Sequence, residues 1–429
     1  MLIPLLPQVR SIQRVLEKLY DDCINGKSTL LLVPEGIRPS DIWNLLREVL
    51  WQNTITFEEI QADSMVNSSN PISTLIDIFG VDIPINQPYT VQNLFHYASA
   101  LPRVIHIDFL DMLNSSNTQS WLTLLQRWAQ ATQSWASLGR DRCCLCFIMP
   151  LSVAMELIPL TDLYLSVYWW WGFPSALEMR SLCRIYDETS PATHLSRWRE
   201  HLIPALAGND LALSEHLWQR LHLSQREVVQ ELQQYAAQRG WTAARLQEWG
   251  AKTLLLGLKE DGFGDLIAPP FQLVELWKRG VLCSTPEYGL EIHSAALAVM
   301  GRVEVIQHRL WRGQVVLLLP LIDHIRLAVC EHLTRVYGDD WPVRWHLPDS
   351  NEAEIAIRAS PLACQIGYLL WLLENCTAFR GEHRARVLIT QALYLRNRIA
   401  HYQPVDFNQF IELLRKKASV YAIAERYVP

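Results

Sequence analysis

The chain has 429 residues, of which 50% are hydrophobic and 19% are charged, and its net charge is -6 at pH 7. This length predicts two to four domains, and the negative charge argues against a surface coated uniformly for nucleic acid. The nine cysteines are odd in number, and the cluster of Cys143, Cys144 and Cys146 has no C-x-x-C partner pair elsewhere in the chain. This is typical of a reduced cytoplasmic protein with buried thiols. No uninterrupted apolar stretch of about 18 residues is present, so we expect no membrane span.

Residues 1–175 alternate between helical and strand patterns. A helix is expected from Arg10 to Cys23, and the apolar run from Thr29 to Val33 is typical of a strand buried on both faces. Further strands are predicted at 104–108, 144–149 and 163–168, with a helix at 121–135. Strands that alternate with helices predict a parallel α/β sheet.

The rest of the chain is predicted to be mainly helical. Residues 176–265 show helical patterns only. In residues 266–300 a helix ends at Gly280 and a short hairpin follows, which resembles a winged helix. Residues 301–429 form a further helical domain that is mildly basic, with 16 Lys and Arg against 13 Asp and Glu.

The strand from Val104 to Asp108, followed by Asp111, looks like a Walker B strand. Together with the order of an α/β domain, a helical domain and a winged helix, it resembles AAA+ and STAND ATPases over about 300 residues. In that family the acid at the end of this strand helps to hold Mg²⁺. The resemblance therefore implies that Asp108 and Asp111 are remnants of a cofactor site. The alternative is that they are solvated acids or cap the next helix.

The phosphate loop of that family is missing. The run Gly26-Lys27-Ser28-Thr29 looks like the end of a Walker A motif, but it precedes the first strand. A phosphate loop must follow a strand and open a helix, because the loop amides and the helix N-terminus hold the phosphates. The segment that does follow the strand, Pro34 to Asp41, has no lysine, two prolines and two acids. We therefore interpret residues 1–175 as a degenerate nucleotide-binding domain without conventional ATP hydrolysis.

A second motif lies near the C-terminus, where Arg396 and Asn397 are followed by His401. Asn397 and His401 are four residues apart and share one face of a helix, while Arg396 lies off that face. Histidine exchanges protons near neutral pH, and the arginine fork matches phosphate oxygens. These residue types suit RNA cleavage without a metal, which needs a base for the 2′-hydroxyl, an acid for the 5′-oxygen and a cation.

With the helices expected at 317–336 and 366–371, this motif resembles HEPN domains of the abortive-infection kind, whose R-N-x-x-x-H pattern matches at all three positions. The resemblance covers about 115 residues. It implies a helical bundle that dimerises with two motifs facing each other, and RNA products with a 2′,3′-cyclic phosphate and a 5′-hydroxyl. Other polar residues are expected to line the cleft unless they form an ordinary solvated face: Asp323, His324, Arg326, Arg398 and Tyr402.

The sequence thus predicts an α/β plus all-α protein with domains at 1–175, 176–265, 266–300 and 301–429. The expected function is a metal-independent endoribonuclease effector of a bacterial anti-phage defence or toxin system, cytoplasmic and dimeric, with a regulatory body that binds partner proteins. RNA is the expected substrate. We expect the protein to use no cofactor and no metal, and to have no association with a membrane. One alternative is a non-catalytic adaptor that dimerises through the HEPN domain. Another is a DNA-binding regulator, although the winged helix offers only Lys278 and Arg279.

Overall fold

The computed structural model describes residues 9–61, 70–98, 100–108, 115–137, 142–151, 154–170, 173–186, 194–219, 224–251, 268–285 and 287–424. The chain forms two compact units. The α/β unit comprises Met1–Met179 and Ala244–His293, and the helical unit comprises Arg180–Ala243 and Ser294–Pro429. The segment expected to resemble a winged helix is therefore divided between the two units after His293.

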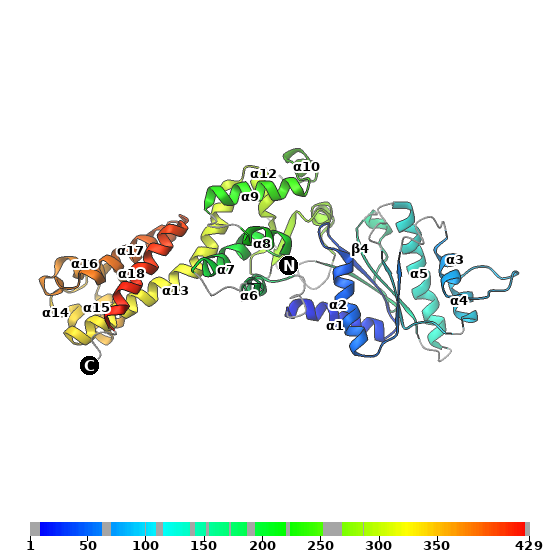
Figure 1. Cartoon of the computed structure of the whole chain (residues 1–429), viewed down its shortest axis with the longest axis horizontal. Coiled ribbons are helices and arrows are strands. Elements are labelled where there is room, and N and C mark those ends of the chain that lie inside the picture. The colour runs from blue at the N-terminus through cyan, green and yellow to red at the C-terminus, as the bar shows by residue number, and fades with distance from the viewer. Residues whose placement is uncertain are drawn as a thin grey trace. The chain divides into compact units, whose positions relative to one another are not determined.

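A five-stranded parallel sheet forms the centre of the α/β unit (Figure 1). In the order β2-β3-β4-β1-β5, its strands are β2 (Phe57–Gln61), β3 (Val104–Asp108), β4 (Cys144–Pro150), β1 (Ser28–Val33) and β5 (Leu165–Trp169). Leu31 of β1 lies opposite Ile148 of β4 and Tyr168 of β5. Every residue of β1 is buried, as expected of a parallel strand covered on both faces. The predicted parallel α/β sheet is confirmed.

Helices cover both faces of this sheet. They are α1 (Arg10–Ile24), α2 (Pro39–Gln52), α3 (Pro71–Ile78), α4 (Val91–Tyr97) and α5 (Ser115–Ser137), with a 3-10 turn η3 (Met155–Leu157). In Figure 1, α1 and α2 lie on one side of the strands and α5 lies on the other, with α3 and α4 beyond it. Trp43 of α2 stacks on His106 of β3 at 3.9 Å, whereas Trp121 of α5 contacts Phe147 of β4 edge-on at 6.2 Å. The unit therefore has three layers, with the sheet in the middle.

A short helix and a hairpin from later in the chain complete the α/β unit. The helix α11 (Val274–Lys278) follows a 3-10 turn η5 (Phe271–Leu273), and β6 (Leu282–Thr285) pairs antiparallel with β7 (Gly289–Ile292). Gly280 has a φ of 68°, a left-handed conformation that glycine adopts without strain. The predicted helix end and hairpin are both present, while the likeness to a winged helix stays a prediction.

Helices alone make up the described part of the helical unit. Two helices, α6 (Ala176–Tyr186) and α10 (Ala243–Glu248), contain the points at which the chain passes from one unit to the other. The others are α7 (His194–Ala207), α8 (Leu211–Trp218), α9 (Gln225–Gln238), α12 (Ser294–Val299), α13 (Val303–Tyr337), α14 (Trp341–Arg344), α15 (Asn351–Ala359), η6 (Pro361–Ala363), α16 (Ile366–Asn375), η7 (Thr377–Phe379), α17 (His383–Ala400) and α18 (Phe407–Ala424).

The 35-residue helix α13 is the longest element of the helical unit. It packs against α7, α9, α12 and α17. By length and by a mean hydropathy of 1.6 over 18 residues, α13 would also be able to cross a membrane, although the sequence led us to expect no span. Its buried polar side chains make hydrogen bonds within the unit, since Arg309 donates from Nη1 to the Ser294 hydroxyl at 2.5 Å and Gln314 donates to the Val405 carbonyl at 2.7 Å. Such contacts are typical of a core helix in a helical bundle.

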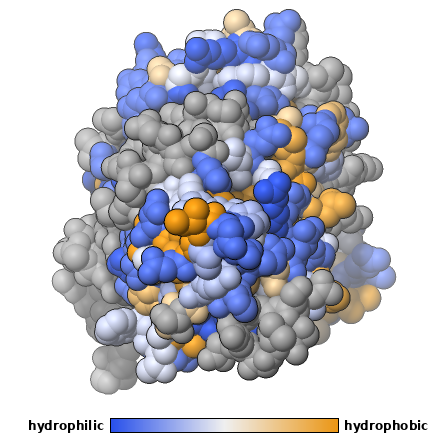
Figure 2. Space-filling model, turned by 90° about the vertical axis from the view of Figure 1, so that its right-hand side faces the viewer, coloured by the Kyte–Doolittle hydropathy of each residue, from blue (hydrophilic) through white to orange (hydrophobic). Residues whose placement is uncertain are grey.

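Figure 2 shows one face of the molecule in space-filling form. Among the described residues on this face, hydrophilic residues predominate and the hydrophobic residues form separate patches. Scattered hydrophobic atoms of this kind are normal on a protein surface and do not mark a binding site.

Candidate functional site

The carboxyl edge of the sheet is one candidate site, because open α/β sheets bind ligands outside the carboxyl ends of their strands. Ser28 and Thr29 are the first residues of β1, so Gly26 and Lys27 lie at the opposite, amino end of the strand. This is the placement that the sequence predicts. Asp108 ends β3 at the carboxyl edge, but its side chain and the whole of Asp111 lie outside the described residues.

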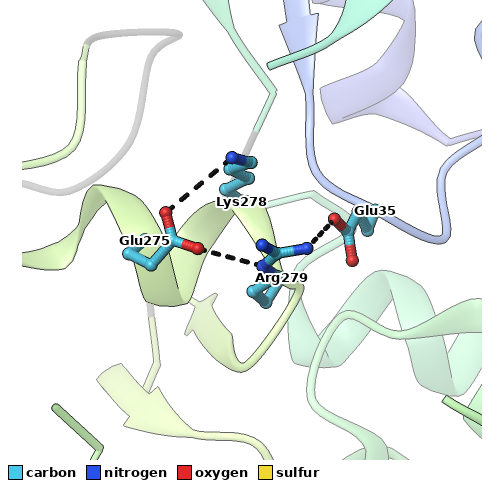
Figure 3. Close-up of polar contacts among 4 residues, drawn as sticks. All are labelled: Glu35, Glu275, Lys278 and Arg279. Carbon is cyan, nitrogen blue, oxygen red and sulfur yellow. Dashed lines mark hydrogen bonds and ion pairs between the residues drawn. The ribbon is translucent and has the colours of Figure 1, made fainter. Parts of the chain in front are cut away.

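The loop that follows β1 is bound by helix α11 (Figure 3). The Glu35 carboxylate lies 2.6 Å from the Arg279 guanidinium, and the Glu35 N–H donates to the Lys278 carbonyl at 2.8 Å. Glu275 pairs with Arg279 at 3.0 Å and with Lys278 at 3.8 Å. Burial works against the charge of Arg279, but the two carboxylates outweigh it and raise the pKa of Arg279. Both cations of this helix are therefore engaged by acids of the same unit.

Tryptophans anchor α11 at the carboxyl ends of β1 and β5. Trp277 Nε1 donates to the Trp170 carbonyl at 3.1 Å, and the Trp170 N–H donates to the Leu32 carbonyl at 2.8 Å. The rings of Trp169 and Trp277 lie 5.0 Å apart. The loop after β1 is the place where a phosphate-binding loop would be expected, and the chain's own helix α11 packs against it. The sequence carried no signal for this, because Glu35 and Arg279 are 244 residues apart.

The Arg-Asn-x-x-x-His motif lies at the C-terminal end of α17. The helix ends at Ala400 and His401 is its C-cap. The Tyr402 N–H donates to the Ile399 carbonyl at 3.2 Å, and the Gln403 N–H donates to the Arg398 carbonyl at 2.9 Å. These two bonds form a Schellman motif, which closes the helix and turns the chain sharply after the histidine.

The three motif side chains are all exposed to solvent. Arg396 donates from Nη1 to Asn397 Oδ1 at 3.2 Å. Within the described part of the chain, no hydrogen bond joins the Asn397 amide to the His401 imidazole, although helical spacing places both on one face. Asn397 instead contacts the guanidinium of Arg396, although helical spacing places Arg396 off the face that Asn397 and His401 share. A cation, an amide and an imidazole therefore lie within the last two turns of one helix.

Several hydrogen bonds hold the turn after His401 against α13. The Gln314 amide donates to the Val405 carbonyl and accepts from the Val405 N–H, both at 2.7 Å. Trp311 Nε1 donates to the Ile399 carbonyl at 2.6 Å, and Arg398 donates to the Pro404 carbonyl at 2.7 Å. The Arg398 side chain, expected in the cleft, thus holds this turn in place. Such ties keep the motif in one geometry, as a catalytic or binding site requires.

Tyr402 lies against two side chains that the sequence did not single out. Its ring centroid is 4.6 Å from that of Trp311 and 6.4 Å from that of His308, which is nearly parallel to it at 20°. The His308 and Trp311 rings are 5.1 Å apart. Both come from α13, about 90 positions earlier in the chain, so no spacing in the sequence relates them to the motif.

The expected cleft residues Asp323, His324 and Arg326 lie further along α13. The helices α13 and α17 run antiparallel, because Trp311 contacts Ile399 while His332 contacts Glu382. At 1.5 Å per residue, this register places Asp323 about 10 Å along the helix axis from Arg396. Asp323 and His324 are exposed there.

Arg326 makes contacts of a structural kind. Its guanidinium pairs with Asp323 at 2.8 Å and donates to the carbonyls of Leu362 and Cys364. It therefore fixes η6 and the residue that follows it to α13. The structure brings Tyr402 together with the motif and leaves the other two acid–base residues, Asp323 and His324, on a separate stretch of helix.

The motif lies in a strongly basic part of the sequence. Residues 383–405 contain four arginines and two histidines but no Asp or Glu. An anion approaching this segment therefore meets no carboxylate of the segment itself, which favours phosphate binding. Among the described residues, no three His, Cys, Asp or Glu side chains are arranged to hold a metal ion.

These features define an α/β protein with a parallel five-stranded sheet and a bundle of helices that carries an exposed Arg-Asn-x-x-x-His motif. No protein-family model matches the chain, and no curated protein matches its sequence. Among solved structures, the chain is similar to the Aeropyrum pernix ORC2 protein in complexes with ADPNP and ADP, with 13% identity over 70% of this chain and 94% of that chain. The TM-score of 0.27 is too low to assign a shared fold.

Proposed function

We propose that this protein is a metal-independent endoribonuclease of the HEPN kind that acts through Arg396, Asn397 and His401. The observation that supports this most is the exposed motif at the end of α17, in a segment without acids and held rigidly by α13. A cation and an imidazole within two turns of one helix provide the two kinds of group that the reaction needs, for charge neutralisation at phosphorus and for proton transfer.

The proposed reaction is attack of a ribose 2′-oxygen on the adjacent phosphorus. His401 removes the 2′-hydroxyl proton or protonates the leaving oxygen, and Arg396 binds the phosphate oxygens. The bond from phosphorus to the 5′-oxygen breaks, and that oxygen takes a proton. The products carry a 2′,3′-cyclic phosphate and a 5′-hydroxyl. Because one His401 cannot act as base and acid in the same step, we propose that a second copy of the chain supplies the other histidine.

We further propose that the α/β unit is an AAA+- or STAND-like body without ATP hydrolysis, which binds regulatory partner proteins. The engagement of Glu35 by Arg279 and Lys278 supports this, since α11 takes the loop in which a phosphate would bind. The same contacts weigh against the DNA-binding alternative, because both cations of that helix already pair with glutamates. The proposed setting is a bacterial defence or toxin system in the cytoplasm, in which RNA cleavage halts growth.

The test is cleavage of RNA by the full chain in the presence of EDTA, with products identified by mass spectrometry. His401→Ala is expected to slow cleavage by about 100-fold or more, the usual contribution of a general acid or base. His383→Ala is the matched control, because this exposed histidine lies at the other end of α17. Equal cleavage by the wild type and His401→Ala would refute the proposal. A chain that dimerises without any cleavage would favour the adaptor alternative.

A further inference from the structure

Tyr402 combines exposure with an unfavourable backbone conformation. Its side chain is 65% exposed, although it is a large aromatic residue. Its φ of 57° lies in the left-handed region, and it fills the position of the Schellman motif where glycine is usually found. Non-glycine residues in that region are strained, and such strain is concentrated at functional sites. The fold of the turn alone would favour glycine, so the tyrosine ring calls for another explanation.

The ring belongs to a preformed aromatic cluster, which consists of Tyr402, Trp311 and His308. Trp311 supports Tyr402 from one side, and its indole is itself held by the hydrogen bond to Ile399. His308 lies nearly parallel to the Tyr402 ring and is exposed. Rigid aromatic faces that remain open to solvent are suited to stacking on flat ligands.

The charges around the cluster favour a polyanion. Tyr402 directly follows His401, and the segment 383–405 contributes four arginines and no acid, with Asp406 as the next acid after it. The nearest acid along α13, Glu304, lies one turn before His308 and is paired with Arg302. Aromatic faces next to cationic side chains are the usual means of binding single-stranded nucleic acid, whose bases are free to stack.

We infer that Tyr402, Trp311 and His308 bind one unpaired base of the RNA beside the scissile phosphate, so that the substrate of the site is single-stranded. This inference rests on the proposed function and adds the substrate class to it. A base held against Tyr402 brings its own ribose and phosphate next to His401, the preceding residue. A base within a duplex is stacked and paired, and it cannot present its face to the ring.

The test measures fluorescence anisotropy of the full chain with a fluorescein-labelled, single-stranded 2′-O-methyl oligoribonucleotide. This probe cannot be cleaved, because it lacks the nucleophilic 2′-hydroxyl. Tyr402→Gly is expected to weaken binding by about 5- to 100-fold, the range for loss of one stacked base, while Tyr402→Phe keeps the ring and the affinity. Tyr89→Ala, at an exposed tyrosine of the α/β unit, is the control and should bind like the wild type.

Two further measurements separate stacking from other causes. In the wild type, an abasic nucleotide at one position of the probe should lower the affinity as much as Tyr402→Gly does. The abasic probe and Tyr402→Gly together should lower the affinity no further than either change alone. Glycine fits the left-handed position, so Tyr402→Gly is expected to fold. Tyr402→Leu keeps apolar bulk without an aromatic face and should also lose affinity. The inference would be overturned if Tyr402→Gly bound the single-stranded probe as tightly as the wild type does. It would also be overturned if Tyr402→Gly weakened binding of a duplex of the same sequence by the same factor.

Cleavage of a natural RNA distinguishes this inference from the proposed function. If the probe binds through Tyr402 but no RNA is cut, the nuclease proposal fails while the base-binding site stands. If RNA is cut through His401 while the Tyr402→Gly and Tyr402→Leu variants bind like the wild type, the base-binding site fails while the nuclease stands.

Discussion

The carboxylate of Glu382, at the start of α17, contacts two polar side chains of α13. Its carboxylate lies 3.0 Å from His332 Nε2 and 3.1 Å from the Tyr337 hydroxyl, and its side chain is 16% exposed. The hydrogen bond from His332 is the main cause that holds the pKa of Glu382 below its usual value, and burial opposes it. A lowered pKa in the folded state stabilises the fold above the unfolded value of about 4.3. That stabilisation is lost as the pH falls through the folded value.

Glu382→Gln is therefore expected to lower the free energy of unfolding by about 1 kcal/mol near neutral pH, and by progressively less below about pH 4.3. Urea unfolding over this pH range measures the difference. Glu331→Gln is the matched control, because Glu331 is exposed beside His332 on the same helix. A loss of stability that stays constant into acid would show that the Glu382 carboxylate does not act through its charge.

Single residues of the candidate site differ in how far the sequence reveals them. Asn397 and His401 could be placed on one helix face from sequence, because helical spacing is local and needs only the helix to form. His308 and Trp311 could not, since their approach to Tyr402 depends on the antiparallel pairing of α13 and α17. Local patterns do not encode which turns of two distant helices meet.

At the scale of elements, buried strands were the easiest to predict. The apolar runs at 104–108 and 144–149 correspond to β3 and β4, because strands covered on both faces need unbroken apolar sequence. The edge strand β2 was missed, since Phe57–Gln61 includes two glutamates and pairs with one neighbour only. The start of α13 was also missed by 14 residues, because buried Arg309 and Gln314 interrupt the apolar pattern there.

The crossing of α13 and α7 offers a prediction about packing. A Cβ added at Gly313 would lie 2.7 Å from the His201 carbonyl oxygen and 3.1 Å from the Leu202 Cα. Because both contacts are with backbone, Gly313→Ala must push the helices apart. We expect a loss of about 1–2 kcal/mol, since overpacking costs about 1–3 kcal/mol and alanine returns up to about 1 kcal/mol of helix propensity.

The control for Gly313→Ala is Gly367→Ala in α16, where an added Cβ meets nothing within 4 Å. That substitution should leave the midpoint of urea unfolding unchanged or raise it slightly, because only the gain in helix propensity remains. If both variants unfold like the wild type, the close approach of α13 to α7 is not what stabilises the helical unit.

Over the whole molecule, the two units carry different parts of the proposed function. The residues proposed to act on RNA all belong to the helical unit. In the α/β unit, α11 contacts the loop after β1, whereas the sequence alone showed that this loop lacks a lysine and contains two prolines and two acids. The ion pairs of that loop became visible only in the fold, since they join the first strand to a helix 244 positions later.

The proposed need for a second copy of the chain leads to a prediction about mixtures. Wild type and His401→Ala are mixed at equal concentration, and subunits are allowed to exchange before RNA is added. In a two-fold symmetric dimer that needs both histidines, about a quarter of the wild-type activity should remain, because only dimers of two wild-type chains are active. If each His401 acts alone, the equimolar mixture should keep about half of the wild-type activity, because every wild-type chain is then active whichever chain it pairs with. A mixture with His383→Ala measures any loss due to exchange itself, and retention of half the activity would refute a shared site.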